Sequence, residues 1–187
     1  MRRRVLTYNS TSLSNAALRL QQLVESTGYE PDCVLSIRRG GEEVGKLMFG
    51  KAAHESTCLQ RPGSRAKGSL FSKLLKYLPR PVLDRLRIAE AWYLARRTPR
   101  CVDPATVILP ELGRYERIII IDDAVDSGAT LRAVRDAVKM HYPAADVLTA
   151  VITVTTRRPV ILPDFSLYNN LTLIRFPWSA DSQQNKE

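Results

Sequence analysis

The sequence has no apolar run approaching the roughly 18 residues of a membrane-spanning helix, so we expect no transmembrane segment. Its basic start, residues 1–7, also lacks the apolar core of a secretory signal. Cysteine is scarce: Cys33, Cys58 and Cys101 are odd in number and have no metal-ligand spacing. A disulfide framework is therefore excluded, and reduced thiols in a cytoplasmic protein are the expectation.

At 187 residues the chain is long enough to bury a full hydrophobic core, and we expect one domain over residues 1–187. The net charge of +9 is concentrated in residues 61–100, where eleven Lys and Arg face two acids. The rest of the chain holds 17 basic and 17 acidic residues. The basicity therefore belongs to one segment, which could contact nucleic acid or an acidic partner, or could be a solvated outer face.

The clearest motif begins with four consecutive isoleucines at residues 118–121. This run predicts a strand buried on both faces, as in a parallel sheet, which ends at Asp122 and Asp123. A loop of small residues follows, and then apolar residues recur at helical spacing over 131–138. Such a loop and helix N-terminus suit a phosphate, and the two carboxylates suit ribose hydroxyls, directly or through a divalent cation.

A second strand–loop–helix unit lies nearer the start of the chain. Residues 33–37 predict a short strand, and residues 42–53 predict a helix. Between them stand Arg38, Arg39, Gly40 and Gly41. Adjacent glycines let backbone amides approach an anion, and arginines supply charged donors. Taken alone, the unit is also compatible with an ordinary glycine turn.

The remaining chain alternates strand and helix patterns. Loop composition at residues 60–69 predicts either a mobile loop or a plain solvated linker. The alternation favours right-handed βαβ units and a parallel sheet, with ligands beyond the carboxyl ends of the strands. The further strands are expected at 54–59, 105–109 and 146–154, and the further helices at 13–27, 69–78 and 82–93.

These motifs resemble those of type I phosphoribosyltransferases, nearest the bacterial and archaeal xanthine-guanine-hypoxanthine branch. The acid pair with Val125-Asp126-Ser127-Gly128-Ala129-Thr130 resembles the phosphoribosyl-pyrophosphate signature, and Arg39-Gly40-Gly41 resembles the pyrophosphate loop. Pro163-Asp164-Phe165 and Phe176-Pro177-Trp178 resemble the family's C-terminal hood. The resemblance implies an α/β, Rossmann-like parallel-sheet fold. It also implies a mobile loop and basic helical insertion at 61–104, a hood at 155–178 and a disordered tail at 179–187.

The resemblance further implies an enzyme that transfers ribose 5-phosphate from phosphoribosyl pyrophosphate to a nucleobase-like acceptor, with Mg²⁺, as in purine salvage. It gives Asp126 the role of catalytic acid or base, a role compatible with capping the next helix. It assigns the binding of ribose and Mg²⁺ to Asp122 and Asp123. The residues assigned to the 5-phosphate are Asp126, Ser127, Gly128, Ala129 and Thr130. The residues assigned to pyrophosphate are Arg38, Arg39, Gly40 and Gly41. Those assigned to the acceptor base are Thr156, Leu173 and Ile174.

Two positions depart from the family pattern. The family's base-contacting lysine falls near Thr156 or Arg157, and its stacking aromatic falls near Leu173, so the acceptor stays open. The resemblance also implies a homo-oligomer, as a dimer, and a cis peptide between Arg38 and Arg39. The alternatives are a non-catalytic sensor of the donor or of nucleotides that binds nucleic acid through residues 61–100, and a scaffold or membrane-surface protein.

Overall fold

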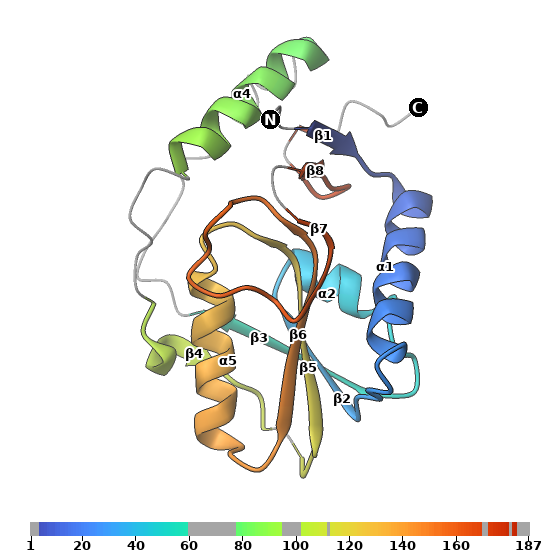
Figure 1. Ribbon diagram of the computed structural model, residues 1–187, viewed down its shortest axis with the longest axis vertical. Coiled ribbons are helices and arrows are strands. Elements are labelled where there is room, and N and C mark those ends of the chain that lie inside the picture. Colours follow the sequence, from blue (N-terminus) through green and yellow to red (C-terminus); the bar gives the residue numbers. More distant parts are fainter. Residues whose placement is uncertain are drawn as a thin grey trace.

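A six-stranded sheet forms the centre of the computed structural model, with strand order β4-β3-β2-β5-β6-β7 (Figure 1). Every neighbouring pair is parallel except β3 and β4, which are antiparallel. The expected α/β parallel-sheet fold is therefore confirmed. The structure describes residues 4–59, 78–94, 102–111, 113–169, 172–179 and 181–182.

The described elements follow the chain in this order: β1 (Arg4–Thr7), α1 (Ser10–Glu25), β2 (Cys33–Ile37), α2 (Gly40–Gly45), β3 (Ala53–Leu59), α4 (Arg80–Leu94), the 3-10 helix η1 (Pro104–Thr106), β4 (Val107–Ile108), β5 (Arg117–Val125), α5 (Ala129–His141), β6 (Asp146–Val154), β7 (Phe165–Tyr168) and β8 (Thr172–Arg175).

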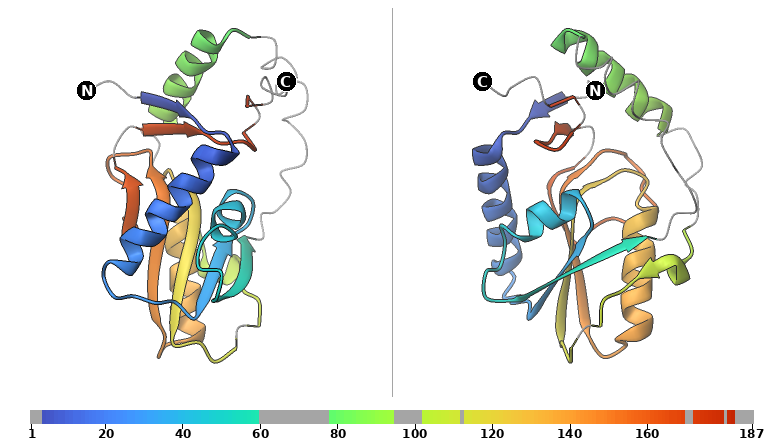
Figure 2. Two further views of the ribbon diagram at one scale, coloured as in Figure 1. Left: turned by 90° about the vertical axis from the view of Figure 1, so that its right-hand side faces the viewer. Right: turned by 180° about the vertical axis from the view of Figure 1, so that it is seen from behind.

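Helices cover both faces of the sheet, with α1 and α2 on one face and α5 on the other (Figures 1 and 2). The isoleucines of β5 alternate between the two faces. Ile119 and Ile121 pack in the core beneath α1, whereas Ile118 and Ile120 pack in the core beneath α5. Because all four are fully buried, the strand needs an unbroken apolar run rather than an alternating one.

Helix α1 confirms the predicted helix at 13–27 but begins earlier, at Ser10. Asn9 caps it, because its side chain accepts a hydrogen bond from the Ser12 amide at 2.8 Å while the Ser12 hydroxyl accepts from the Asn9 amide. The apolar residues that recur along it at helical spacing are buried except Leu23, which is 39% exposed; the buried ones are Leu13, Ala16, Ala17, Leu20 and Val24. Gly28 follows the helix at φ +78°, a conformation that favours glycine.

Helix α2 is much shorter than predicted, because it ends at Gly45 and not at residue 53. Gly45 lies against β2, where a Cβ atom would come within 2.1 Å of the Ser36 hydroxyl oxygen. The amides of Leu47 and Met48 then bond three residues back, with Met48 donating to the Gly45 carbonyl at 3.0 Å. Phe49 turns the chain at φ +49° and is buried in the core.

Two predicted strands also differ from the structure. The strand expected at 105–109 consists of η1 followed by the two-residue strand β4, which runs antiparallel at the sheet edge. The strand expected to end at the acid pair continues to Val125, so the acid pair lies within β5. The strands at 33–37 and 146–154 have the predicted bounds, and the strand at 54–59 begins one residue earlier.

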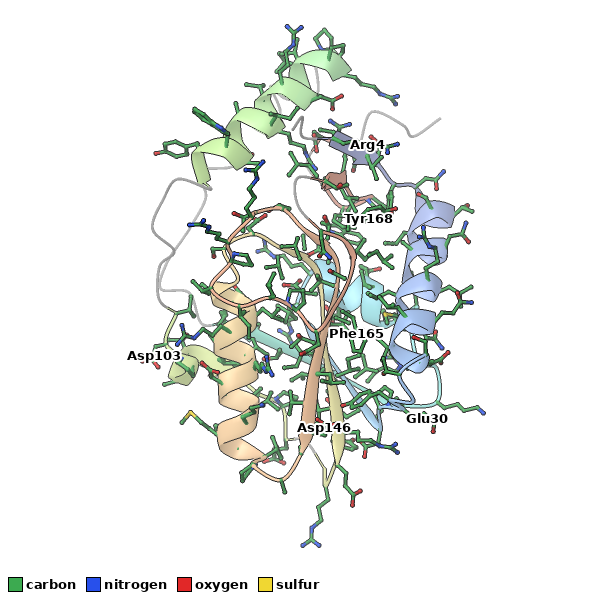
Figure 3. The ribbon with its side chains drawn as sticks, viewed as in Figure 1. Arg4, Glu30, Asp103, Asp146, Phe165 and Tyr168 are labelled. Atoms are coloured by element: carbon green, nitrogen blue, oxygen red, sulfur yellow. The ribbon has the colours of Figure 1, made fainter. Side chains whose placement is uncertain are left out.

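A separate pair of parallel strands, β1 and β8, lies at one end of the molecule (Figure 1). In Figure 3, Arg4 and Tyr168 lie at this end, and Asp146, at the start of β6, lies at the opposite end. The carboxyl ends of the sheet strands therefore face β1 and β8. Helix α4 lies beyond them and confirms the helix predicted at 82–93. The helix predicted at 69–78 and the loop predicted at 60–69 lie outside the described residues, apart from Leu78.

In the part of the chain that the structure describes, no helix is long and apolar enough to span a membrane.

Candidate functional site

The basic loop (residues 38–41) and the acid pair (Asp122 and Asp123) meet at the carboxyl ends of β2 and β5. These two strands are direct neighbours, with Ser36 opposite Ile121. A Cβ atom on Gly40 would lie 2.0 Å from Oδ2 of Asp123, and one on Gly41 would lie 2.5 Å from the Ile121 carbonyl oxygen. Only glycine permits this approach, so the two motifs form one site.

The backbone of the basic loop is strained, but not as expected. None of the described peptide bonds is cis, so the prediction of a cis bond between Arg38 and Arg39 is wrong. Arg39 instead has φ +85° and ψ −101°, a conformation that is rare for any residue with a side chain. The amide of Arg38 still pairs with the Thr57 carbonyl at 2.8 Å, after which the chain turns into α2. Both arginine side chains belong to exposed residues.

The ionised forms of the two acids in the pair are disfavoured by their surroundings. Burial raises the pKa of Asp122 well above its usual range, and the negative charge of Asp123 raises it further. Burial also raises the pKa of Asp123, although hydrogen bonds from Asp122 and from the Trp178 indole oppose the shift. The backbone amide of Asp123 donates to Asp122 Oδ1 at 2.9 Å, which fixes the Asp122 carboxylate against the backbone of the next residue.

The donor set of the acid pair fits Mg²⁺. The described residues contain no cluster of three or more metal-ligating side chains, so a closed protein cage is not built. Mg²⁺ is usually held by one or two carboxylates, with waters and substrate phosphates completing the shell. The two adjacent carboxylates of Asp122 and Asp123 match that requirement.

The small-residue loop (residues 126–130) leads from β5 into α5. Gly128 precedes the helix at φ +79°, and no side chain caps the helix among the described residues. The Ala129 amide donates to the Ser127 hydroxyl at 3.3 Å. A Cβ atom on Gly128 would lie 3.0 Å from the Ile161 carbonyl oxygen, so a neighbouring segment also requires glycine here. Helix N-termini without a side-chain cap are able to bind anions through their first-turn amides, so a phosphate site here stays a prediction.

Asp126 is exposed at the start of this loop and does not cap α5, since Gly128 occupies the capping position. The hydroxyl of Thr155 donates to Oδ1 of Asp126. The Thr155 amide donates to the Val125 carbonyl at 2.9 Å, and the residue is buried. Thr155 therefore orients the carboxylate of Asp126. Sequence reasoning missed this role, because the two residues follow different strands, β5 and β6, and lie 29 residues apart in the chain.

Trp178 is a second residue that sequence reasoning did not assign to the site. Its indole N–H donates to Oδ2 of Asp123 at 3.0 Å, and its ring stacks on Phe176 at a centroid distance of 4.9 Å. With Arg39, Glu43 and Pro177 it lines an open hollow of about 430 Å³. The Phe-Pro-Trp motif was the signal that could have placed Trp178 here.

The structure does not bring all the predicted base-binding residues to this hollow. Leu173 and Ile174 lie on β8 and are buried, and neither lines the hollow. Ile174 packs in the core beneath α1, together with Phe176. Thr156 is half-buried and directly follows Thr155, beside the small-residue loop.

A parallel sheet presents a basic glycine loop, two acids and a helix N-terminus without a side-chain cap at one end, an arrangement typical of proteins that bind phosphorylated sugars. The chain belongs to the phosphoribosyltransferase family, because the phosphoribosyl transferase domain matches residues 7–185. The predictions of the family and of a phosphoribosyltransferase enzyme are thereby confirmed, and the non-catalytic alternatives are not favoured. No curated protein matches the chain in sequence.

Solved structures share the fold at low sequence identity. The purine phosphoribosyltransferase of Pyrococcus horikoshii has a TM-score of 0.58 at 18% identity, with 94% of each chain covered. The xanthine-guanine-hypoxanthine phosphoribosyltransferase of Helicobacter pylori has a TM-score of 0.62 at 15% identity, covering 94% of this chain and 92% of that one. A hypothetical protein of Neisseria gonorrhoeae with bound ppGpp has a TM-score of 0.64 at 14% identity, covering 100% and 96%.

Proposed function

We propose that the protein transfers ribose 5-phosphate from phosphoribosyl pyrophosphate to a purine-like nucleobase and releases pyrophosphate. The observation that carries the proposal is the contact between Gly40 and Asp123, which joins the basic loop to the acid pair. Membership of the family supports the reaction. The purine enzymes among the structural neighbours, and the guanine nucleotide bound to the Neisseria protein, support the purine class. We assign this activity to one domain, residues 1–187.

In the proposed reaction the bond from C1 of the ribose to the pyrophosphate oxygen breaks, and a bond from C1 to a ring nitrogen of the acceptor forms. The pyrophosphate leaves with the electron pair. Backbone amides of residues 127–130 and the hydroxyls of Ser127 and Thr130 hold the 5-phosphate. The side chains of Arg38 and Arg39 and the amides of Gly40 and Gly41 hold the pyrophosphate and stabilise its growing charge.

The acid pair would hold the ribose hydroxyls and a Mg²⁺ ion, and the ion would supply positive charge to the leaving pyrophosphate. Asp126 takes the proton from the acceptor nitrogen, and the hydroxyl of Thr155 keeps its carboxylate in place. The acceptor base binds beside Thr156 and β8, whose Leu173 and Ile174 shape this end of the hood. The family's lysine and aromatic are replaced there, so the contacts to the purine differ from those of the family.

Pyrophosphate release tests the proposal directly. The protein is mixed with phosphoribosyl pyrophosphate, Mg²⁺ and, in turn, hypoxanthine, guanine, xanthine and adenine. We expect release that requires both Mg²⁺ and one or more of these bases, with the matching nucleotide as the second product. If the donor binds but none of the four bases leads to pyrophosphate release, the purine assignment is contradicted. The predicted dimer and the predicted contact with nucleic acid through residues 61–100 remain predictions.

A further inference from the structure

One carboxylate connects the basic loop to the hood (residues 155–178). The Asp123 side chain faces Gly40 on one side, where a Cβ atom would lie within 2.7 Å of both carboxylate oxygens. On another side Oδ2 accepts the hydrogen bond from the Trp178 indole. Phe176 stacks parallel to the Trp178 ring, with an interplanar angle of 3°, and is itself buried. The position of the hood therefore sets the position of the indole N–H that hydrogen-bonds to Asp123.

The hood is fixed by a buried arginine that immediately precedes Phe176. The Arg175 side chain is 5% exposed, and each of its nitrogens has a partner. Nε donates to Asp181 at 2.9 Å, one terminal nitrogen donates to Asp84 at 2.7 Å, and the other donates to Thr7 at 3.0 Å. Strands β1 and β8, helix α4 and the chain after the hood therefore meet at one guanidinium group.

Helix α4 contributes a second arginine to the same cluster. Arg87 forms two hydrogen bonds with the carboxylate of Asp181, at 2.9 and 3.1 Å, and a third with the Ile174 carbonyl at 2.7 Å. Paired bonds of this kind fix orientation as well as position. We call this cluster the hood clamp; it consists of Asp84, Arg87, Arg175 and Asp181.

We propose that Trp178 is a positioning residue for Asp123, and that the hood clamp lets α4 hold Trp178 in place. This inference rests on the proposed function. A carboxylate next to another carboxylate is repelled by it and can rotate away. The indole N–H holds Oδ2 of Asp123 in place. Oδ1 of Asp123 and the carboxylate of Asp122 are then left to bind the ribose and Mg²⁺. On this account the described part of the basic insertion serves the site by supporting the hood.

The indole contact is tested by Trp178→Phe, which keeps a ring to stack on Phe176 and removes only the N–H donor. Removing a partner that orients a metal ligand typically costs about 10–100-fold in metal affinity or activity. We expect the dissociation constant of phosphoribosyl pyrophosphate with Mg²⁺ to rise by that factor, while the thermal midpoint stays unchanged. The matched control is Trp92→Phe, which replaces the second of the two tryptophans and should bind the donor normally.

The same variants provide a spectroscopic signal. Trp92→Phe leaves Trp178 as the sole tryptophan, so its emission should change when Mg²⁺ and donor are added together. Trp178→Phe leaves only Trp92, 55% exposed on α4, and its emission should stay constant. A silent Trp178, or donor affinity in Trp178→Phe within twofold of the wild type, overturns the positioning role.

The clamp is tested by Arg87→Lys, which keeps the charge but cannot bond both oxygens of Asp181. Its control is Arg85→Lys, because Arg85 is exposed on the same helix and no bond joins it to the hood among the described residues. We expect Arg87→Lys to weaken donor binding several-fold and Arg85→Lys to leave it unchanged. Equal effects of the two changes contradict the clamp. If the wild type binds no donor at all, the proposed function itself fails. This outcome is distinct from a failure of the positioning role, which is judged by comparing variants with a wild type that binds the donor.

Discussion

Gly41 lies directly against the backbone of β5, because a Cβ atom on this residue would stand 2.5 Å from the carbonyl oxygen of Ile121 and 3.0 Å from Cα of Asp122. The neighbouring Gly40 meets a side chain instead, the carboxylate of Asp123. Backbone in the centre of a sheet cannot yield, whereas a side chain can rotate. Gly41 is therefore required for folding stability, whereas Gly40 is required for the position of the Asp123 carboxylate.

We accordingly expect Gly41→Ala to lower the free energy of unfolding by about 1–3 kcal/mol, the usual cost of overpacking a filled interior. Gly40→Ala should be milder in stability but should push Asp123 out of place and abolish Mg²⁺-dependent donor binding. Urea unfolding and donor titration of both variants check this. The account is contradicted if Gly40→Ala binds the donor like the wild type.

Asp122→Asn should make the protein more stable and inactive. Because burial and Asp123 raise the pKa of Asp122, its ionised form destabilises the folded state. Relieving this should add about 0.5–2 kcal/mol, typical of stabilising changes at functional sites. The gain should be largest above the raised pKa of Asp122 and should shrink as the pH falls through it, since the wild-type carboxyl is then protonated too. Thermal unfolding across pH measures this, and a loss of stability at neutral pH would argue against it.

The hood clamp should have the opposite pH dependence. Burial alone would raise the pKa of Asp181, but the hydrogen bond from Arg175 and the charge of Arg87 outweigh it and hold the pKa below its usual value. Its contribution to stability is therefore present above the unfolded-state pKa and is lost as the pH falls through the lower, folded-state pKa. Asp181→Asn should cost about 1–3 kcal/mol at neutral pH, because it leaves Arg175 buried with one fewer partner. The difference from wild type should disappear in acid.

Thr155 offers a test of the proton transfer assigned to Asp126. Thr155→Val removes the hydroxyl that donates to Asp126, and Thr155→Ser retains it. Removing a general acid or base typically costs about 10²–10⁴-fold, so we expect Asp126→Ala to lower kcat within that range. Thr155→Val should lower kcat by a smaller factor with little change in KM for the donor, and Thr155→Ser should restore most of it. If the two Thr155 variants are equally active, the hydroxyl plays no part in catalysis.

The sequence predicted those features that local patterns determine. Both long central strands, β5 and β6, were recognised because burial on two faces demands a continuous apolar run. The placement of the basic loop and the acid pair at one edge of the sheet followed from parallel strands whose carboxyl ends share that edge, whereas their direct contact was not predicted. The burial of the stripe on α1 likewise followed from helical spacing.

Features that depend on distant contacts were not predicted. Helix α2 ends at Gly45 and Phe49 then turns the chain at φ +49°, two features that the helical pattern does not reveal. The pairing of β1 with β8 joins residues at opposite ends of the chain, Val5 with Leu173 among them. The hydrogen bond from Trp178 to Asp123 likewise spans 55 residues. Each of these is decided by tertiary packing and not by local propensity.

The central claim is that the acid pair holds the donor's ribose together with Mg²⁺, and calorimetric titration with phosphoribosyl pyrophosphate tests it most directly. The wild type should bind the donor in the presence of Mg²⁺ and bind it far more weakly when the ion is chelated. The double variant Asp122→Asn, Asp123→Asn should lose the Mg²⁺-dependent binding while it keeps a cooperative unfolding transition. Donor binding that is unaffected by chelation, or that is as strong in the double variant as in the wild type, would contradict the account.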